Sequence, residues 1–90
     1  MANPDDQIIQ ALRSLSIEQG DRMFIRLADL RTRLADIARD ELDDALDRMY
    51  RTERINLIPY SSPQQINDAD REARFRIGGE YKHLASVIDR

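Results

Sequence analysis

The most acidic stretch of the sequence lies between Asp36 and Asp47, where six acids accompany a single base, Arg39. On a helix these spacings bring carboxylates together, and carboxylate oxygens attract Mg²⁺ or Ca²⁺. The segment contains no loop of the calcium-binding type, and side chains on one exposed helix face rarely enclose a cation. We therefore predict no metal site among these acids.

Two interpretations of the acids remain open. In the first, they form a solvated helix face whose negative charge assists helix initiation. In the second, they form a docking face for a basic protein partner. The residues that would carry the second role are Asp40, Asp43, Asp44 and Asp47.

Basic residues form a second group that could bind a partner. Four arginines lie between Arg22 and Arg33, and four more basic residues lie between Arg71 and Lys82. If the two sets met on one side, they would form a surface for DNA phosphates. The alternative is local pairing, for which Asp70 and Arg74 have the i, i+4 spacing of a helical ion pair. The predicted nucleic-acid-binding residues are Arg31, Arg33, Arg39, Arg71, Arg74, Arg76 and Lys82.

Catalytic residues are not indicated by the sequence. His83 is the only histidine, and without a cysteine it forms no obvious triad or metal cluster, so a structural role is expected for it. The pair Gly78-Gly79 lacks the lysine and the strand-to-helix context of a phosphate-binding loop, and it more simply allows a turn with positive φ. We predict a protein that is not an enzyme and binds no cofactor.

Length and composition set further limits. With 90 residues, 41% apolar content and a formal net charge of −3, the chain predicts one small domain with no general attraction to nucleic acid or anionic lipid. The first residues lack the basic start and apolar core of a signal peptide, and no apolar run approaches the ~20 residues that span a bilayer. A cytoplasmic protein without a membrane segment is expected.

The spacing of apolar residues predicts the elements that position these groups. From Leu42 to Tyr50 the spacing is i, i+3, i+4, i+7, i+8, which packs one helix face against a core. The run from Ile55 to Tyr60 is β-branched and aromatic, as in a strand, and Pro59 indicates that pairing stops near its end.

Capping residues and further apolar runs predict the other elements. Asn3 is a suitable N-cap for a first helix, Pro4 suits its first position, and Gly20 is a natural stop. Three leucines at helical spacing indicate a second, shorter helix that needs docking for stability. The predicted helices are 4–17, 27–34 and 39–53, and the predicted strands are 23–25, 55–60 and 83–88.

A long connection, 61–82, separates the last two predicted strands. Hairpin loops usually have about two to five residues, and loops of this length in compact domains are often functional or mobile. Asn67 is a suitable cap for a short helical turn at 68–74, and the two glycines mark a tight turn after it. The sequence as a whole predicts a single α+β domain.

The stretch from Leu27 to Tyr60, LADLRTRLADIARDELDDALDRMYRTERINLIPY, resembles the second and third helices and the following strand of the winged helix-turn-helix superfamily. The resemblance implies three helices plus a small antiparallel β-sheet with a long wing. It also implies that the third helix enters the major groove of DNA while the wing touches the backbone or minor groove. The residues that share the packing pattern are Leu30, Leu34, Leu42, Leu46, Ile55 and Leu57.

Two functional hypotheses follow from the resemblance. In the first, the protein is a small DNA-binding transcription regulator that binds duplex DNA as a homodimer, because one short recognition helix gives little specificity. The acidic third helix opposes this hypothesis, since DNA binding usually depends on cations that neutralise phosphates. In the second, the domain does not bind DNA and is a protein-interaction module that uses its acidic third helix to bind a basic partner.

Overall fold

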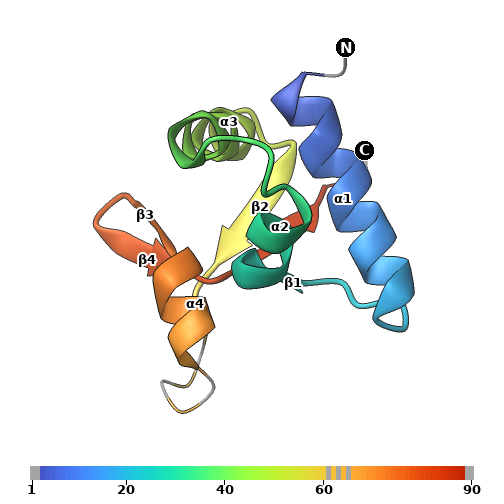
Figure 1. The fold of residues 1–90 in the computed structure, drawn as a ribbon. Helices are drawn as coiled ribbons and strands as arrows, with labels where there is room; N and C mark the ends of the chain where they lie inside the picture. Colours follow the sequence, from blue (N-terminus) through green and yellow to red (C-terminus); the bar gives the residue numbers. More distant parts are fainter. Residues whose placement is uncertain (1–2, 61, 63, 65, 89–90) are drawn as a thin grey trace.

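Helix α3 (Arg39–Arg51) packs one apolar face against the core, as its apolar spacing predicts. In the computed structural model, which describes residues 3–60, 62, 64 and 66–88, the side chains of Leu46 and Met49 on its inner face are fully buried. Helix α1 (Pro4–Glu18) packs against both α3 and α2 (Leu27–Arg33) (Figure 1).

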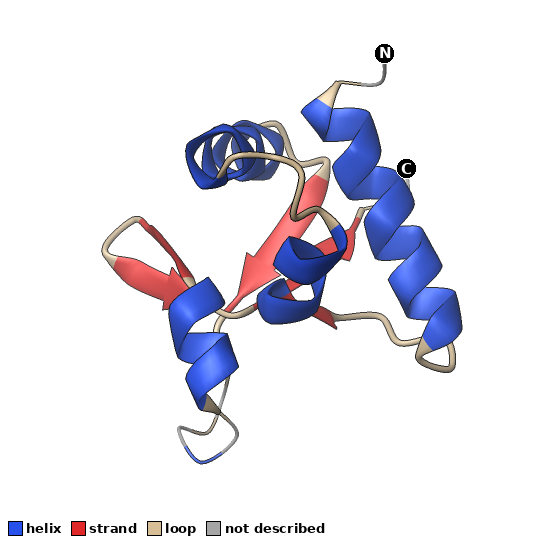
Figure 2. Cartoon of the chain, in the orientation of Figure 1, coloured by secondary structure: helices blue, strands red, loops and turns tan. Residues whose placement is uncertain are grey.

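A three-stranded antiparallel sheet closes the core. Its order is β1 (Ile25–Arg26), β5 (Leu84–Val87), β2 (Ile55–Ile58), so the last strand of the chain lies in the centre (Figure 2). Ala85 is the register partner of Ile25 on one side and of Leu57 on the other. Each of these three residues is at most 1% exposed, which shows that one face of the sheet is buried across all three strands.

A fourth helix, α4 (Asp68–Ala73), lies in the connection between β2 and β5. It begins at a capping box: the Asn67 side chain accepts a hydrogen bond from the Asp70 N–H, and the Asp70 carboxylate accepts one from the Asn67 N–H. The box satisfies main-chain donors that a helix start leaves without partners. Asn67 therefore acts as the cap that the sequence predicts.

A separate two-stranded hairpin follows α4. Its strands are β3 (Phe75–Ile77) and β4 (Glu80–Lys82), and its turn residues Gly78 and Gly79 have φ values of 61° and 79°. A two-residue turn with two positive φ angles matches the twist of a hairpin and favours glycine. The hairpin and α4 lie on the opposite side of the molecule from α1 (Figure 1).

The α+β class is confirmed, and the predicted long connection 61–82 contains more regular structure than expected. It holds α4, where a short helical turn was expected at 68–74, and the β3–β4 hairpin, which was not expected. The described residues therefore contain four helices rather than three. Ser61, Pro63 and Gln65 of this connection lie outside the described residues.

The predicted strands are all longer than the observed ones. Met23 and Phe24 lie outside β1, because β5 pairs with β1 only at Leu84 and Ala85. At the end of β2, Pro59 has no N–H to donate, and the Tyr60 N–H is bonded to the His83 ring instead of a neighbouring strand. Strand β5 spans 84–87 where 83–88 was expected.

The helix ends differ from the predicted ones by one or two residues. The helices predicted at 4–17, 27–34 and 39–53 end at Glu18, Arg33 and Arg51.

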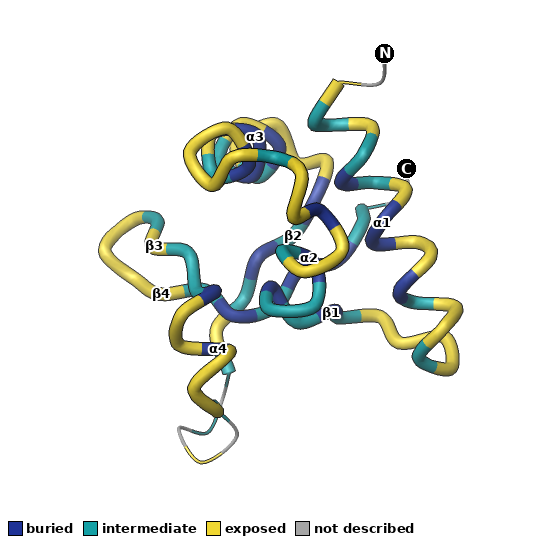
Figure 3. Tube along the Cα trace, viewed as in Figure 1, coloured by how far each residue is buried: buried dark blue, intermediate teal, exposed yellow. Residues whose placement is uncertain are grey.

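Burial follows the inner faces of the helices and the sheet, whereas the hairpin tip and the outer helix faces are exposed (Figure 3). None of the helices in the described part of the chain is both long and apolar enough to span a bilayer.

Candidate functional site

The outer face of α3 is acidic and exposed. Asp40 and Glu41 lie in its first turn and Asp44 one turn later, and Asp36 is exposed just before the helix. Acids in a first turn interact favourably with the positive end of the helix dipole. Among the described residues, no cation lies within ion-pair distance of Asp36, Asp40 or Glu41, so these carboxylates face solvent without a partner.

Asp43 differs from its acidic neighbours because its side chain is only 27% exposed. Its Oδ1 lies 2.7 Å from Nη2 of Arg31, whose own side chain is 13% exposed, and its Oδ2 lies 3.9 Å from Nε of Arg39. The approach of Arg31 is off-axis for a hydrogen bond, so the contact is an ion pair. Asp43 is therefore engaged inside the fold and does not belong to the exposed acidic face.

Arg31 and Arg39 also bind the end of α4. Nε of Arg31 donates a hydrogen bond to the Ala73 carbonyl at 2.7 Å, and Nη2 of Arg39 donates to the Glu72 carbonyl at 2.7 Å. The last carbonyls of a helix lack partners within the helix, and arginines are suitable donors to them. Arg31, Arg39 and Asp43, here called the α4 clamp, thus fix α4 to α2 and α3.

Three further charged residues of the predicted surfaces form ion pairs on the outside of the molecule. Arg33 contacts both oxygens of Glu18, at 2.7 and 2.9 Å, and this hydrogen-bonded contact lowers the pKa of Glu18. Asp47 lies 2.7 Å from Nε of Arg51. Arg71 lies 3.6 Å from Asp68.

The remaining predicted phosphate contacts lie on the β3–β4 hairpin or, for Arg74, directly before it. The guanidinium of Arg74 lies 3.8 Å from the centre of the Tyr81 ring, and that of Arg76 lies 5.6 Å from the same ring. Lys82 is bonded to Glu80 at 2.7 Å, and its side chain is 12% exposed. The structure therefore brings Arg74 and Arg76 together, but Arg31 and Arg33 do not join them in one basic patch.

The expected ion pair between Asp70 and Arg74 does not form, because Asp70 is 2% exposed and faces the core. Its Oδ2 lies 4.0 Å from the Arg26 guanidinium, and its Oδ1 has no hydrogen-bond partner among the described residues. Sequence spacing predicts contacts between neighbouring turns of a helix, such as Asp70 with Arg74. The contact of Asp70 with Arg26 of β1 joins residues far apart in the sequence and therefore depends on the tertiary fold.

His83 links three parts of the fold, as a structural residue would. Its N–H donates to the Ile58 carbonyl and its carbonyl accepts from the Leu27 N–H, both at 2.9 Å. Its Nδ1 accepts a hydrogen bond from the Tyr60 N–H at 3.3 Å. Burial lowers the pKa of His83 below its ordinary value of 6.5, in accord with a neutral ring that accepts a hydrogen bond.

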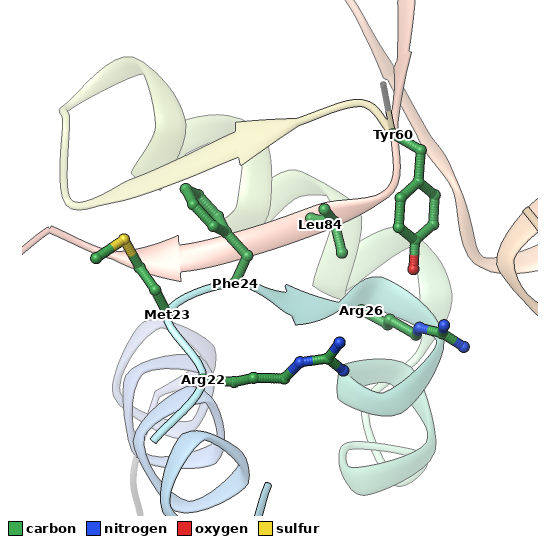
Figure 4. A pocket seen from close by; sticks show the side chains of 6 residues that line it. All are labelled: Arg22, Met23, Phe24, Arg26, Tyr60 and Leu84. Atoms are coloured by element: carbon green, nitrogen blue, oxygen red, sulfur yellow. The ribbon is translucent and has the colours of Figure 1, made fainter. Parts of the chain in front are cut away.

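A hollow beside β1 was not foreseen from the sequence. It has a volume of about 420 Å³, and Tyr60 points its hydroxyl toward Arg26 at one end of it (Figure 4). That hydroxyl has no hydrogen-bond partner among the described residues, and burial raises its pKa. The sequence signal that could have indicated it is an apolar pair, Met23 and Phe24, between two arginines. The lining residues, which define the edge hollow, are Arg22, Met23, Phe24, Arg26, Tyr60 and Leu84.

No side chains are arranged for metal binding in the part of the chain that the structure describes: no three His, Asp or Glu residues are placed to share an ion. Comparison of the chain with protein-family models, with curated proteins and with solved structures found no match.

Proposed function

We propose that the chain is a winged helix-turn-helix domain that works as a protein-interaction module. Support for the fold comes from the order of elements, in which α2 and α3 follow β1 and precede the paired strands β2 and β5. In this interpretation α2 and α3 are the helix-turn-helix, α3 takes the place of the recognition helix, and the β3–β4 hairpin is the wing. Helix α4 is an addition before the wing.

The observation that carries the proposed function is the division of charge on and around α3. The helix that would face DNA presents Asp40, Glu41 and Asp44 to solvent, whereas Arg31 and Arg39 are occupied by Asp43 and by the end of α4. A surface of this kind repels phosphate and attracts cations. The partner that fits it is a protein surface rich in Lys or Arg.

Asp40→Lys with Asp44→Lys is expected to abolish capture of that partner without unfolding the domain, because both side chains are exposed. The measurement is capture from a cell extract on the immobilised protein, followed by identification of the retained proteins by mass spectrometry. Asp43 is left unchanged in this variant, because it belongs to the α4 clamp and its loss would disturb the fold.

The matched control is Asp6→Lys with Glu72→Lys. It changes the net charge by the same amount, and Asp6 is also an exposed acid in the first turn of a helix. A basic partner retained by the wild type and the control but lost from the α3 variant supports the proposal. A basic partner retained by all three proteins contradicts it.

Binding to duplex DNA is the second candidate function, favoured by the two arginines that lie over Tyr81 on the hairpin. A wing that carries two cations can contact the DNA backbone or minor groove. If this function is correct, a fluorescence-anisotropy titration with a random-sequence duplex at low salt gives binding that weakens steeply as salt is added. Arg76→Ala then reduces the magnitude of the slope of log binding constant against log salt concentration by about 1, which is the contribution of one phosphate contact. Absence of binding at low salt excludes this second candidate.

A further inference from the structure

The sheet has a free edge at β1. Strand β1 pairs with β5 on one side only, and the chain just before it, Met23 and Phe24, makes no main-chain hydrogen bond with any other described residue. The Leu27 N–H is bonded to the His83 carbonyl on β5. Since antiparallel ladders alternate, the N–H group of Arg26 points away from β5 and is available to another strand. The N–H group of Phe24, which lies in a bend just before the ladder, has no main-chain partner among the described residues either.

Apolar surface surrounds this edge. Met23 is 74% exposed and Ile17, on the neighbouring end of α1, is 72% exposed. Met23 lines both the edge hollow and a second hollow of about 500 Å³, whose lining also includes Ile17 and Val87. Large exposed apolar side chains beside two hollows indicate a surface that a partner covers.

The edge is also basic. Arg22 and Arg26 both line the edge hollow, and their side chains lie on the same side of β1 (Figure 4). Among the described residues no carboxylate lies within ion-pair distance of Arg22, and the nearest one to Arg26 is Asp70 at 4.0 Å. The charge of Arg22 is therefore uncompensated beside apolar surface.

We propose that the free edge at residues 22–26 binds an extended segment of another protein, in which acidic and apolar side chains alternate, as an added antiparallel or parallel strand. Main-chain hydrogen bonds to Phe24 and Arg26 supply the strand pairing, and the alternate side chains reach the arginines and the hollows. This surface is separate from the acidic face of α3, which packs on β2 at the other edge of the sheet.

A second copy of this chain fits the edge less well. In a two-fold antiparallel pairing centred on Phe24, Arg22 of each copy would lie opposite Arg26 of the other copy. Like charges directly opposite one another destabilise a strand pair. The charge at the edge therefore favours an acidic partner over self-association.

The test uses a fluorescein-labelled peptide of alternating Glu and Val residues, with a Lys–Val peptide for comparison. We expect the Glu–Val peptide alone to bind in an anisotropy titration, and Arg22→Glu to weaken binding roughly tenfold. Bound peptide should also slow hydrogen exchange at the amides of Phe24 and Arg26. The charge-matched control is Arg76→Glu, which places the same change on the hairpin and should leave binding unchanged.

Four results would overturn the proposal. Equal loss in the Arg22→Glu and Arg76→Glu variants would mean that only net charge matters. Equal binding of both peptides, or binding that leaves exchange at Phe24 unchanged, would exclude strand addition. Self-association of the free protein through the same amides would assign the edge to a second copy. The double variant Asp40→Lys with Asp44→Lys should still bind the peptide, so this test is independent of the proposed function.

Discussion

Arg31→Ala is expected to lower the free energy of unfolding by roughly 3 kcal/mol, the lower end of the range for a buried ion pair that loses one partner. The substitution leaves the carboxylate of Asp43, only 27% exposed, without its 2.7 Å partner. It also removes the hydrogen bond to the Ala73 carbonyl at the end of α4. The measurement is urea unfolding followed by circular dichroism.

Arg33→Ala is the matched control for this prediction. Arg33 is two residues further along and also pairs with a carboxylate, but both partners are exposed to solvent, where ion pairs add little to stability. The free energy of unfolding of the Arg33→Ala variant should stay close to that of the wild type. If the two variants were equally stable, the α4 clamp would have no structural role, and Arg31 would be free to serve as a phosphate contact.

The double variant Arg31→Met with Asp43→Leu separates the two parts of the effect. Replacement of both charges by apolar groups of similar size removes the ion pair without leaving a charge buried, and such changes are often close to neutral. We expect this variant to be more stable than Arg31→Ala. A double variant less stable than the single one would show that the ion pair itself supplies most of the stability.

Leu46→Ala is expected to lower the free energy of unfolding by about 2–5 kcal/mol, because it removes buried atoms and leaves a cavity. Leu46 is 0% exposed and lies on the inner face of α3, between the helices and the sheet. Thermal and urea unfolding both report the change. Any binding of DNA or of a protein partner through α3 would also weaken, because the position of α3 on the domain depends on the packing of Leu46.

Met23→Ala provides the comparison for Leu46→Ala. It also shortens a large apolar side chain, but Met23 is 74% exposed, so little buried surface is lost and stability should hardly change. At the same time this variant should weaken binding of the Glu–Val peptide. Marked destabilisation by Met23→Ala would mean that Met23 packs inside the fold, and that the apolar surface at β1 is not open to a partner.

The sequence predicts the part of the fold whose signals are local and repeated. The stripe from Leu42 to Tyr50 places α3, the residues after Asn3 place α1, and the β-branched run at Ile55 places β2. Residues 66–82 carry local signals only in the Asn67 cap and the glycine pair, and no repeated apolar pattern, because α4 has only six residues and the hairpin strands have three each. Their structure depends on contacts with α2 and α3, such as that between Arg31 and Ala73, which lie 42 residues apart.

Whether a charged residue forms an ion pair or stays exposed could be predicted only where its partner is close in sequence. Asp40 stays exposed, as its place in the first turn of α3 suggests, and Asp47 pairs with Arg51 one turn away. Asp43 stands between these two, yet it turns toward an arginine of α2. Residue type and spacing show that a cation and an anion could pair, but the packing of helices decides which ones do.

The central place of β5 in the sheet has a consequence for the order of folding. Strands β1 and β2 do not pair with one another, so neither gains a neighbour until residues 84–87 have been synthesised. Helices α1, α2 and α3 can meet earlier, because the contacts between them span shorter stretches of chain. In the interval, the main-chain edges of β1 and β2 that will face β5 have no partner and can pair with other nascent chains. The final strand therefore decides how long the newly made protein stays vulnerable to misassembly.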